Sequence, residues 1–481
     1  MPEVKRYNKI RFTLLTSLIV FYFFQMINCN ANPVHRNGYV NNAYKVKFSD
    51  LNCDNKLDFI VSGHKGESIL TFINNSNLSF EKKITGFNEY FKSKRVSPIF
   101  NFDIADINND CFNDIVIGLG GWGYDQRLPD NNILNNDNTL TSSEYLNYWK
   151  GEIIIGINDK NGKFRINQNK SFLDTDSQPK DVKFIDFNCD GILEIVGIER
   201  GVPNTHKKIQ NKLFPQLIYD EHLELFESYA GNRNKNLEIK LKNNIYSGLL
   251  HIKSIDNSPK GINILEIIPA DAYYILPLDV KNRCTKKFAV AHFRQGVVSI
   301  INFSEKSDAP KIEVLRSPMK ESEFNDVRTI DYNNDNKDDL VIADIKNNLL
   351  QFWKRTNYSV FDRLVFWKKN KSYTYDFSVE VGEKPTFMAI ENNKKVFVTH
   401  WKSDFISIYD TQKNILKKIN VNLGPYGIDI NNINNDEYLD IVLANHLSDK
   451  LNLILSVNTE NMRIMDIKSS TKLVNGKWEA Q

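Results

Sequence analysis

Five copies of a nine-residue acidic segment place oxygen-bearing side chains at their positions 1, 3, 5 and 9. Alternate residues of a tight loop point the same way, so the first three oxygens can converge, and position 9 can close the cage. Calcium binds six to eight such oxygens. The candidate ligands are Asp50, Asn52, Asp54, Asp58, Asp106, Asn108, Asp110, Asp114, Asp186, Asn188, Asp190, Glu194, Asp331, Asn333, Asp335, Asp339, Asn432, Asn434, Asp436 and Asp440.

Two other structures could contain segments of this kind. An EF-hand needs a bidentate Glu at position 12 and a helix afterwards, whereas position 12 here is apolar or Gly and the following residues read as a strand. The second interpretation is a set of Asx-rich turns in an Asn-rich chain. Repetition of the same four positions favours a metal loop, with the copy that begins at the neutral Asn432 as the weakest candidate.

The loop followed by Asp-(Ile/Leu)-Val resembles the FG-GAP/VCBS repeat over most of residues 40–460. The resemblance implies an all-β fold, a β-propeller in which each repeat is one four-stranded blade and calcium lies between its first two strands. The Phe-Gly and Gly-Ala-Pro words of that family are mostly absent from this chain. The resemblance speaks for fold and calcium and says little about function, because one fold hosts many functions.

Two further repeats are degenerate, which brings the predicted total to seven blades. In the repeat at Asp279, positions 3, 5 and 9 are Lys281, Arg283 and Lys287, so cations replace the oxygens and no calcium is expected. The sixth repeat is shortened at residues 391–395 and is also expected to lack metal. We expect the last blade to be completed by strands from both chain ends, with residues 462–473 and those before Ala43 as candidates.

Four cysteines that follow the N-terminal segment occupy loop positions. Cys53 and Cys189 are at position 4 of the first and third loops, and Cys111 and Cys284 are at position 6 of the second and fourth. If consecutive loops lie on consecutive blades, two identical disulfides follow, Cys53–Cys111 and Cys189–Cys284. Four separate thiols are the alternative, since four cysteines allow three connectivities and repeat position alone selects this one.

A second pattern lies five or six residues after the ninth loop position, where four histidines recur. That length of strand spans roughly 16–20 Å, so these side chains cannot reach the calcium and belong to the opposite face. They could form a partner surface, a transition-metal site or an acid/base centre, or simply serve as turn residues. The expected partner-binding face comprises His64, Trp122, Arg200, His292, Asp344, His400 and His446.

Residues 1–31 have a basic start, a long apolar run and small residues before a cleavage point, which is typical of a signal peptide. An uncleaved anchor is the alternative, and export of residues 32–481 is predicted. Insertions are expected at about 118–150 and 202–237, the second with a helix over residues 213–226.

The net charge of +3 gives no field that would attract nucleic acid, and no other stretch could span a membrane. No Ser/His/Asp signature, phosphate-binding glycine loop or zinc-type CxxC is present. The sequence therefore predicts a calcium-stabilised scaffold that binds a protein or glycan partner. The alternative is an exported enzyme, acting on polysaccharide or through a transition metal at the histidine face; whether the chain is an enzyme stays open.

Overall fold

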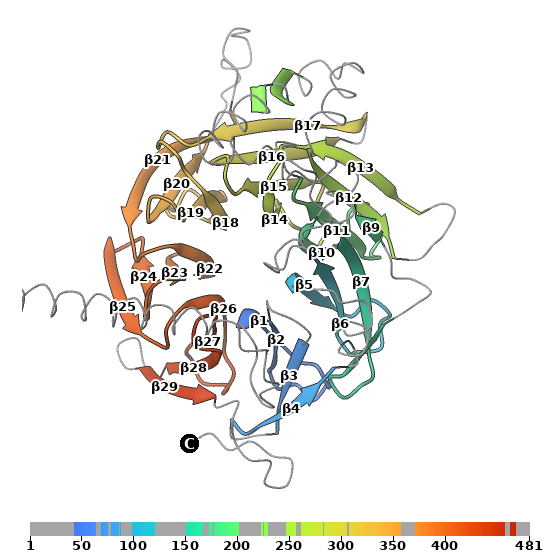
Figure 1. Cartoon of the computed structure of the whole chain (residues 1–481), viewed down its shortest axis with the longest axis vertical. Coiled ribbons are helices and arrows are strands. Elements are labelled where there is room, and N and C mark those ends of the chain that lie inside the picture. The colour runs from blue at the N-terminus through green and yellow to red at the C-terminus, as the bar shows by residue number, and fades with distance from the viewer. Residues whose placement is uncertain are drawn as a thin grey trace, which may run out of the picture. The chain divides into compact units, whose positions relative to one another are not determined.

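The structure is a computed structural model, and its described residues form seven sheets arranged in a ring (Figure 1). Six sheets have four strands and one has five, so the predicted seven-bladed β-propeller is confirmed. All described residues lie in the compact unit Val40–Gln481. They are residues 43–63, 69–75, 78–85, 87, 99–120, 151–166, 173–175, 178–201, 223–224, 226–228, 247–255, 261–281, 283–304, 307–356, 371–456 and 462–467.

Each blade uses four strands in chain order, counted outward from the axis of the ring. The first strands are β1 (Ala43–Ser49), β5 (Ile99–Ala105), β10 (Pro179–Ile185), β14 (Ala272–Leu278), β18 (Phe324–Ile330), β22 (Pro385–Glu391) and β26 (Pro425–Asn431). The second strands are β2 (Asp58–Gly63), β6 (Asp114–Leu119), β11 (Glu194–Glu199), β15 (Lys287–His292), β19 (Asp339–Asp344), β23 (Lys395–His400) and β27 (Asp440–Asn445).

The outer half of each blade follows in the same order. The third strands are β3 (Ile69–Asn74), β7 (Gly151–Asn158), β12 (Gly248–Ser254), β16 (Val297–Ser304), β20 (Leu349–Arg355), β24 (Phe405–Asp410) and β28 (Lys450–Ser456). The fourth strands are β4 (Phe80–Ile84), β8 (Phe164–Ile166), β13 (Asn263–Ile268), β17 (Ser307–Arg316), β21 (Tyr373–Glu380), β25 (Ile415–Asn420) and β29 (Met462–Ile467). The extra strand β9 (Leu173–Thr175) pairs with β7.

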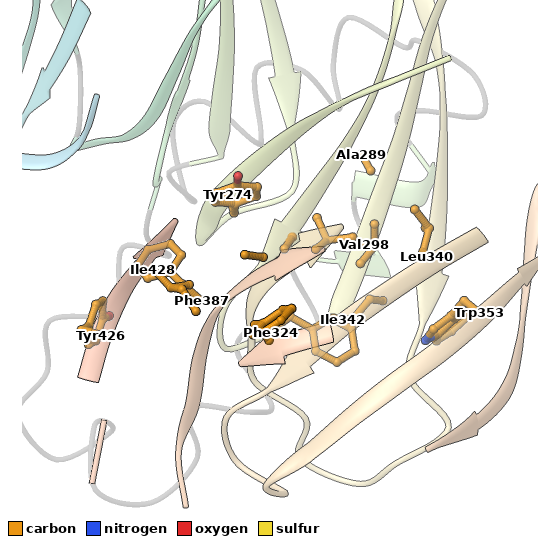
Figure 2. Close-up of a cluster of buried hydrophobic side chains, with 14 of the residues drawn as sticks. Tyr274, Ala289, Val298, Phe324, Leu340, Ile342, Trp353, Phe387, Tyr426 and Ile428 are labelled. Atoms are coloured by element: carbon orange, nitrogen blue, oxygen red, sulfur yellow. The ribbon is translucent and has the colours of Figure 1, made fainter. Parts of the chain in front are cut away.

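Burial explains why the second strands read as unbroken apolar runs. A second strand is covered on both faces by neighbouring blades, and every residue of β2 and of β19 is buried. A fourth strand meets water at the rim, and β25 contains only exposed and half-buried residues. The core therefore lies between blades. In Figure 2, Phe324, Phe387 and Tyr426 from three successive first strands are parts of one buried cluster.

The ring closes without exchange of strands in the described part of the chain. The last sheet is β26-β27-β28-β29 and the first is β1-β2-β3-β4, so the expected closure by strands from both ends is wrong. An apolar seam joins the two blades instead, and it includes Phe48 and Phe59 from one blade and Val442 and Leu453 from the other. Burial across this seam takes over the role of the shared hydrogen bonds.

Most of both predicted insertions lies outside the described residues. In the second, residues 223–224 and 226–228 are helical, in agreement with part of the predicted helix. Phe226 is buried there against Ile267 of β13, so the helical turn packs on the outside of blade three. Among the described residues, no helix has the length and apolar character needed to cross a membrane.

Candidate functional site

The acidic loops lie where the sequence predicts them, between the first and second strands. Position 9 is the first residue of β2, β6, β11, β19 and β27. All five loops therefore emerge from the same end of their blades. In blades one, two, three and five the backbone at positions 4 and 6 is left-handed, for example at Cys53 (φ 58°) and Asn55 (φ 64°) of the first loop. The left-handed residues curl the chain around position 1.

Backbone amides hold the position-1 carboxylate in these four loops. In the second loop, the amides of Asp110 and Cys111 donate to the two oxygens of Asp106 at 3.2 and 2.8 Å. The equivalent bonds in the fifth blade join Asp335 and Asn336 to Asp331 at 3.0 and 2.9 Å. These bonds span four and five residues. Asx-turn bonds, which span two, occur within the same loops, from the amides of Asp110 and Asp335 to Asn108 and Asn333 at 3.0 and 2.9 Å. Local side-chain-to-backbone bonds thus account for the backbone shape of the loop.

In the loop of blade five the acidic side chains also converge. One carboxylate oxygen from each of Asp331, Asp335 and Asp339 lies within 4.8 Å of the other two. Asn333 donates its side-chain amide to Asp339 at 2.8 Å, and its carbonyl oxygen accepts the backbone amide of Asp335 at 2.9 Å. Three carboxylates form a hard donor set of the kind calcium prefers. The turn geometry alone would not require this convergence.

Position 9 has a second role that the sequence did not reveal. The Asp58 carboxylate accepts the amide of Leu51 in the loop and the amide of Asn74 at the end of β3, both at 2.8 Å. Asp440 makes the same two bonds with Ile433 and Ser456. Burial raises the pKa of Asp58 to about 7, and the two amide bonds oppose that rise. The ninth residue thus fastens the loop to two strands.

The seventh loop departs from the other four. Its position 6, Glu437, is not left-handed, and Asn432 donates its side-chain amide to the backbone oxygen of Asp436 instead of accepting backbone amides. Its neutral first residue removes one of the three carboxylates that the other loops carry. It therefore stays the weakest candidate for a metal loop, as the sequence predicts.

Blades four and six carry an ammonium group at the same turn. In blade four, Lys287 at position 9 lies 3.2 Å from Asp279, which also forms a two-bond ion pair with Arg355. In blade six, Lys395 lies 2.8 Å from Glu391 across a short hairpin. In both turns a lysine side chain of the protein supplies the positive charge. That these two turns bind no calcium stays a prediction.

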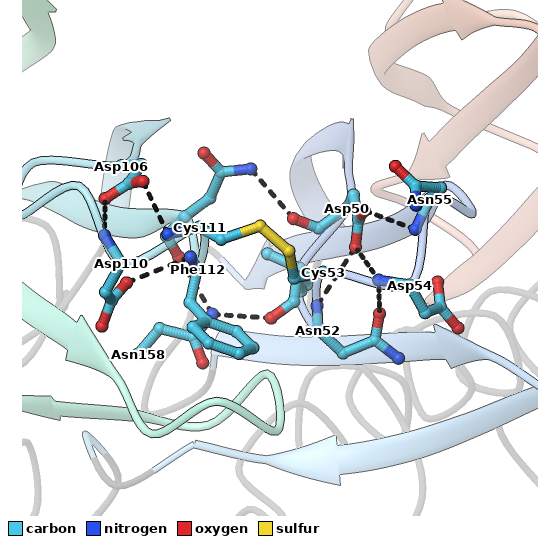
Figure 3. Close-up of a disulfide and its surroundings, with 12 residues drawn as sticks. Asp50, Asn52, Cys53, Asp54, Asn55, Asp106, Asp110, Cys111, Phe112 and Asn158 are labelled. Carbon is cyan, nitrogen blue, oxygen red and sulfur yellow. Dashed lines mark hydrogen bonds between the residues drawn. A yellow bond between two sulfur atoms is a disulfide. The ribbon is translucent and has the colours of Figure 1, made fainter.

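Two disulfides join neighbouring loops, as predicted. Cys53 bonds Cys111, with the two Cα atoms 5.9 Å apart, and Cys189 bonds Cys284, with a separation of 5.2 Å. Figure 3 shows that the first bridge lies between the Asp50 and Asp106 turns. Structural disulfides of this kind are typical of proteins exported to oxidising compartments.

The opposite end of the second strands is built differently. His292 and His400, the last residues of β15 and β23, are fully buried. Each ring lies 2.8 Å from a serine hydroxyl on the next strand, Ser299 for His292 and Ser407 for His400. Desolvation lowers the pKa of His292 to about 4 and that of His400 to about 3. Both rings are therefore neutral at pH 7 and act as packing groups.

The same polar pairing recurs at this position with other residues. Asp344 accepts a bond from Gln351 at 2.8 Å, Asn445 bonds Asn452 at 2.9 Å, and Glu199 pairs with His251. The recurrence of histidine thus reflects a repeated cross-strand pair, which matches the interpretation of these histidines as structural residues. The pair was not apparent from the sequence, although the second partner follows seven residues after the first in blades four to seven.

This burial corrects the expected partner face. Arg200, which pairs with Asp271, and Asp344, His292 and His400 are all at most 4% exposed, because their polar atoms bond within the protein. His446 is half-buried, one residue beyond the strand, with its ring centroid 5.5 Å from that of Tyr426. His64 and Trp122 lie outside the described residues.

A polar cluster along the ring axis was missed by sequence reasoning. Every first strand has an irregular register near its start, which leaves one residue out of the ladder in six strands and two residues in β22. Three of these residues are tyrosines from blades one, four and seven. Tyr44 and Tyr273 have hydroxyls 2.8 Å apart, and the Tyr426 hydroxyl lies 3.2 Å from that of Tyr44. The hydroxyls meet at the end opposite the loops.

Aspartates of four first strands then link their blades to the following blade. Asp103, Asp181, Asp326 and Asp429 each accept a backbone amide from the first strand of the following blade, at 2.8–3.1 Å. Although burial alone would raise the pKa of Asp103, the charges of Lys47 and Lys183 lower it to about 2. The alternating charged residues of the first strands could have indicated these contacts.

No protein-family model matches the chain, and no curated protein matches it. Solved structures do match, and they include two β-propeller domains. One is the β-propeller domain of Cps50 (Swd1) from Myceliophteria thermophila, with 7% identity, coverage of 86% of this chain and 96% of that chain, and a TM-score of 0.47. The other is the WD40 β-propeller domain of Doa1, with 7% identity, coverage of 88% of this chain and 95% of that chain, and a TM-score of 0.47. An inactive variant of virginiamycin B lyase from Staphylococcus aureus matches with 11% identity, 82% and 87% coverage, and a TM-score of 0.40. At these identities the likeness concerns the fold alone.

Proposed function

We propose that the protein is an exported β-propeller of the FG-GAP/VCBS type, stabilised by calcium, that serves as a scaffold for a protein or glycan partner. The observation that carries the calcium part is the convergence of Asp331, Asp335 and Asp339 within 4.8 Å. Two disulfides and the signal-like residues 1–31 support export.

The residues fit calcium in kind and in number. Blades one, two, three and five each offer three carboxylates and one Asn oxygen, and backbone carbonyls and water can complete a shell of six to eight. Bound calcium would neutralise carboxylates that otherwise repel each other. Because an ion that binds only the folded loop stabilises it by mass action, each site adds to the stability of the ring.

The partner surface is best supplied by half-exposed apolar residues at the end opposite the loops. Leu423 and Leu447 flank Gly424 in blade seven and are 50% and 46% exposed. His446 and Trp401 lie at the same end and are half-buried. An enzyme using the predicted histidine face is not favoured, because His292 and His400 are buried and paired.

Metal content tests the calcium part of this proposal. The chain from residue 32 onward is purified without chelator, and calcium, zinc, copper and iron are measured by elemental analysis. We expect three to five calcium ions per chain and a clearly lower melting temperature in EDTA. A chain that carries no calcium, and melts at the same temperature with EDTA, would refute it; stoichiometric zinc, copper or iron would revive the enzyme alternative.

The scaffold part is tested by changing the exposed leucines. Leu423→Asp/Leu447→Asp should reduce retention of the protein on immobilised cell-surface material and leave the melting temperature unchanged. Ile415→Asp, at an exposed position on the rim strand β25, is the matched control. Pretreating the material with protease or with glycosidase separates a protein partner from a glycan, and equal retention of all variants would reject this surface.

A further inference from the structure

Three of the four disulfide cysteines lie in proposed calcium loops, and the fourth, Cys284, lies in the degenerate loop beside one. This placement suggests a role beyond joining blades. Cys53 and Cys111 occupy positions 4 and 6, both in the left-handed region, with φ of 58° and 77°. Cys189 at position 4 of the third loop is also left-handed, with φ of 66°. Left-handed backbone is unfavourable for a residue with a Cβ atom, and Asn or Gly usually occupies such positions. The cross-links therefore hold the conformation that curls these loops.

Cys111 is in direct contact with a proposed ligand. Its backbone amide donates to Asp106 at 2.8 Å, so the residue that carries the disulfide also orients the first carboxylate of the loop. Across the bridge, the amide of Asn55, two residues after Cys53, donates to Asp50 at 2.8 Å. Each half of the disulfide thus lies within two residues of an amide that fixes a first-position carboxylate.

Further bonds make the first two loops one unit. Asn113 donates to the backbone oxygen of Asp50 at 2.9 Å and to the Ser49 hydroxyl at 3.0 Å. Asn158 donates to the backbone oxygen of Leu51 at 2.8 Å and to that of Asn113 at 3.0 Å. A displacement of one loop must therefore move the other.

The second disulfide joins a proposed calcium loop to the degenerate one. Asp186, the first ligand of the third loop, donates its amide to Arg283 and accepts the amide of Thr285, each at 3.3 Å. Asp186 also forms an isolated parallel β-bridge with Cys284. The fourth loop, which carries its own cationic side chains, therefore stabilises the conformation of the third loop.

The loop of blade five offers an internal comparison. It contains no cysteine, and Asn334 and Asn336 are its left-handed residues. Asn334 reaches the neighbouring blade through a hydrogen bond of 2.7 Å to Gln412. This loop keeps its geometry with residue types suited to it and with a non-covalent contact.

We propose that the two disulfides tune calcium affinity, with Cys53–Cys111 preorganising two sites, Cys189–Cys284 preorganising one, and the blade-five site independent of both. The proposal rests on the calcium binding proposed above. By linkage, calcium must protect the disulfides from reduction by the same factor by which they raise its affinity. A dithiol reductant supplies two electrons and two protons per bridge, yields two thiols and itself becomes a disulfide. Cys111 and Cys189 are exposed to such a reagent.

Calcium titration by competition with a chromophoric chelator tests the coupling. In Cys53→Ser/Cys111→Ser we expect two sites to weaken about tenfold or more, and in Cys189→Ser/Cys284→Ser one site. Asp331→Asn, made in each background, should remove one site that had kept its affinity. Circular dichroism in saturating calcium confirms that each variant is folded.

If a variant does not fold, a second measurement on the unaltered chain still tests the proposal. The fraction of each disulfide reduced at equilibrium in a series of dithiol/disulfide buffers is measured by mass spectrometry, with calcium and with EDTA. We expect calcium to lower the ratio of reduced to oxidised protein at least severalfold. Calcium bound with equal affinity by all variants, or equal reduced fractions with calcium and EDTA, would overturn the coupling and leave the proposed function intact. An oxidised chain that binds no calcium would instead overturn the proposed function.

Discussion

The two ends of the second strands differ in how their polar side chains are paired. At the end away from the loops, side chains pair within the blade, as His292 does with Ser299 and Asn445 with Asn452. At the loop end of blade five, three carboxylates point toward one another. Where the blade supplies both hydrogen-bonding partners, the pair stabilises the fold. Where it brings like charges together, a bound cation would be needed to neutralise them.

Blades four and six sharpen this comparison, because there the chain carries the cation itself. Lys287 and Lys395 place ammonium groups on Asp279 and Glu391. The same turn thus exists in two versions. In one, a lysine ammonium group lies beside the carboxylate, and in the other we propose that calcium does. Variants at equivalent positions of the two versions should differ in size of effect and in calcium dependence.

The largest difference is expected at position 9. Asp58→Ala removes a buried carboxylate that satisfies the amides of Leu51 and Asn74, and unsatisfied buried donors each cost roughly 1–3 kcal/mol. We expect a loss of about 3 kcal/mol in the free energy of unfolding, measured by urea denaturation. The matched control is Lys287→Ala at position 9 of blade four, which should cost below about 1 kcal/mol. Equal costs for the two variants would contradict the fastening role of Asp58.

A smaller loss is expected at the other end of a strand. His400→Ala removes a fully buried ring and its bond to Ser407, which should lower the free energy of unfolding by about 2 kcal/mol, with the calcium count unchanged. His446→Ala, at a half-buried neighbouring position, is the control and should cost less. If His400→Ala released a metal ion, the structural interpretation of this histidine would be wrong.

Acid should destabilise this same end of the strands. The folded pKa values of His292 and His400 are lowered to about 4 and about 3, below the usual value near 6.5 in an unfolded chain. Between pH 6.5 and about 4 the unfolded chain therefore binds more protons, and stability falls as pH decreases. Each histidine contributes about 1.4 kcal/mol per pH unit in this window. The slope of unfolding free energy against pH should shrink in His400→Ala; an unchanged slope would show that this ring already binds a proton when folded.

The sequence was informative where a residue type has one local use. Repeated Asp and Asn at fixed spacing placed the loops, and the position of Cys53 and Cys111 in consecutive repeats identified their bond. It left two interpretations open for His400, because histidine suits both a surface and a buried hydrogen bond, and only tertiary packing decides between them. The axial contacts of Asp429 and Tyr44 depend on residues about 380 positions away in the chain, where no local pattern reaches.

The smallest effect should come from the first position of the degenerate loop. Asp279→Asn removes partly exposed ion pairs with Lys287 and Arg355, and such pairs contribute about 0–1 kcal/mol. The equivalent change in blade five, Asp331→Asn, keeps a side-chain oxygen but removes one of three converging charges. We therefore expect elemental analysis to find one calcium fewer in Asp331→Asn and no change in Asp279→Asn. If Asp279→Asn also lost calcium, the lysine would not replace the ion, and the two versions of the turn would be chemically alike.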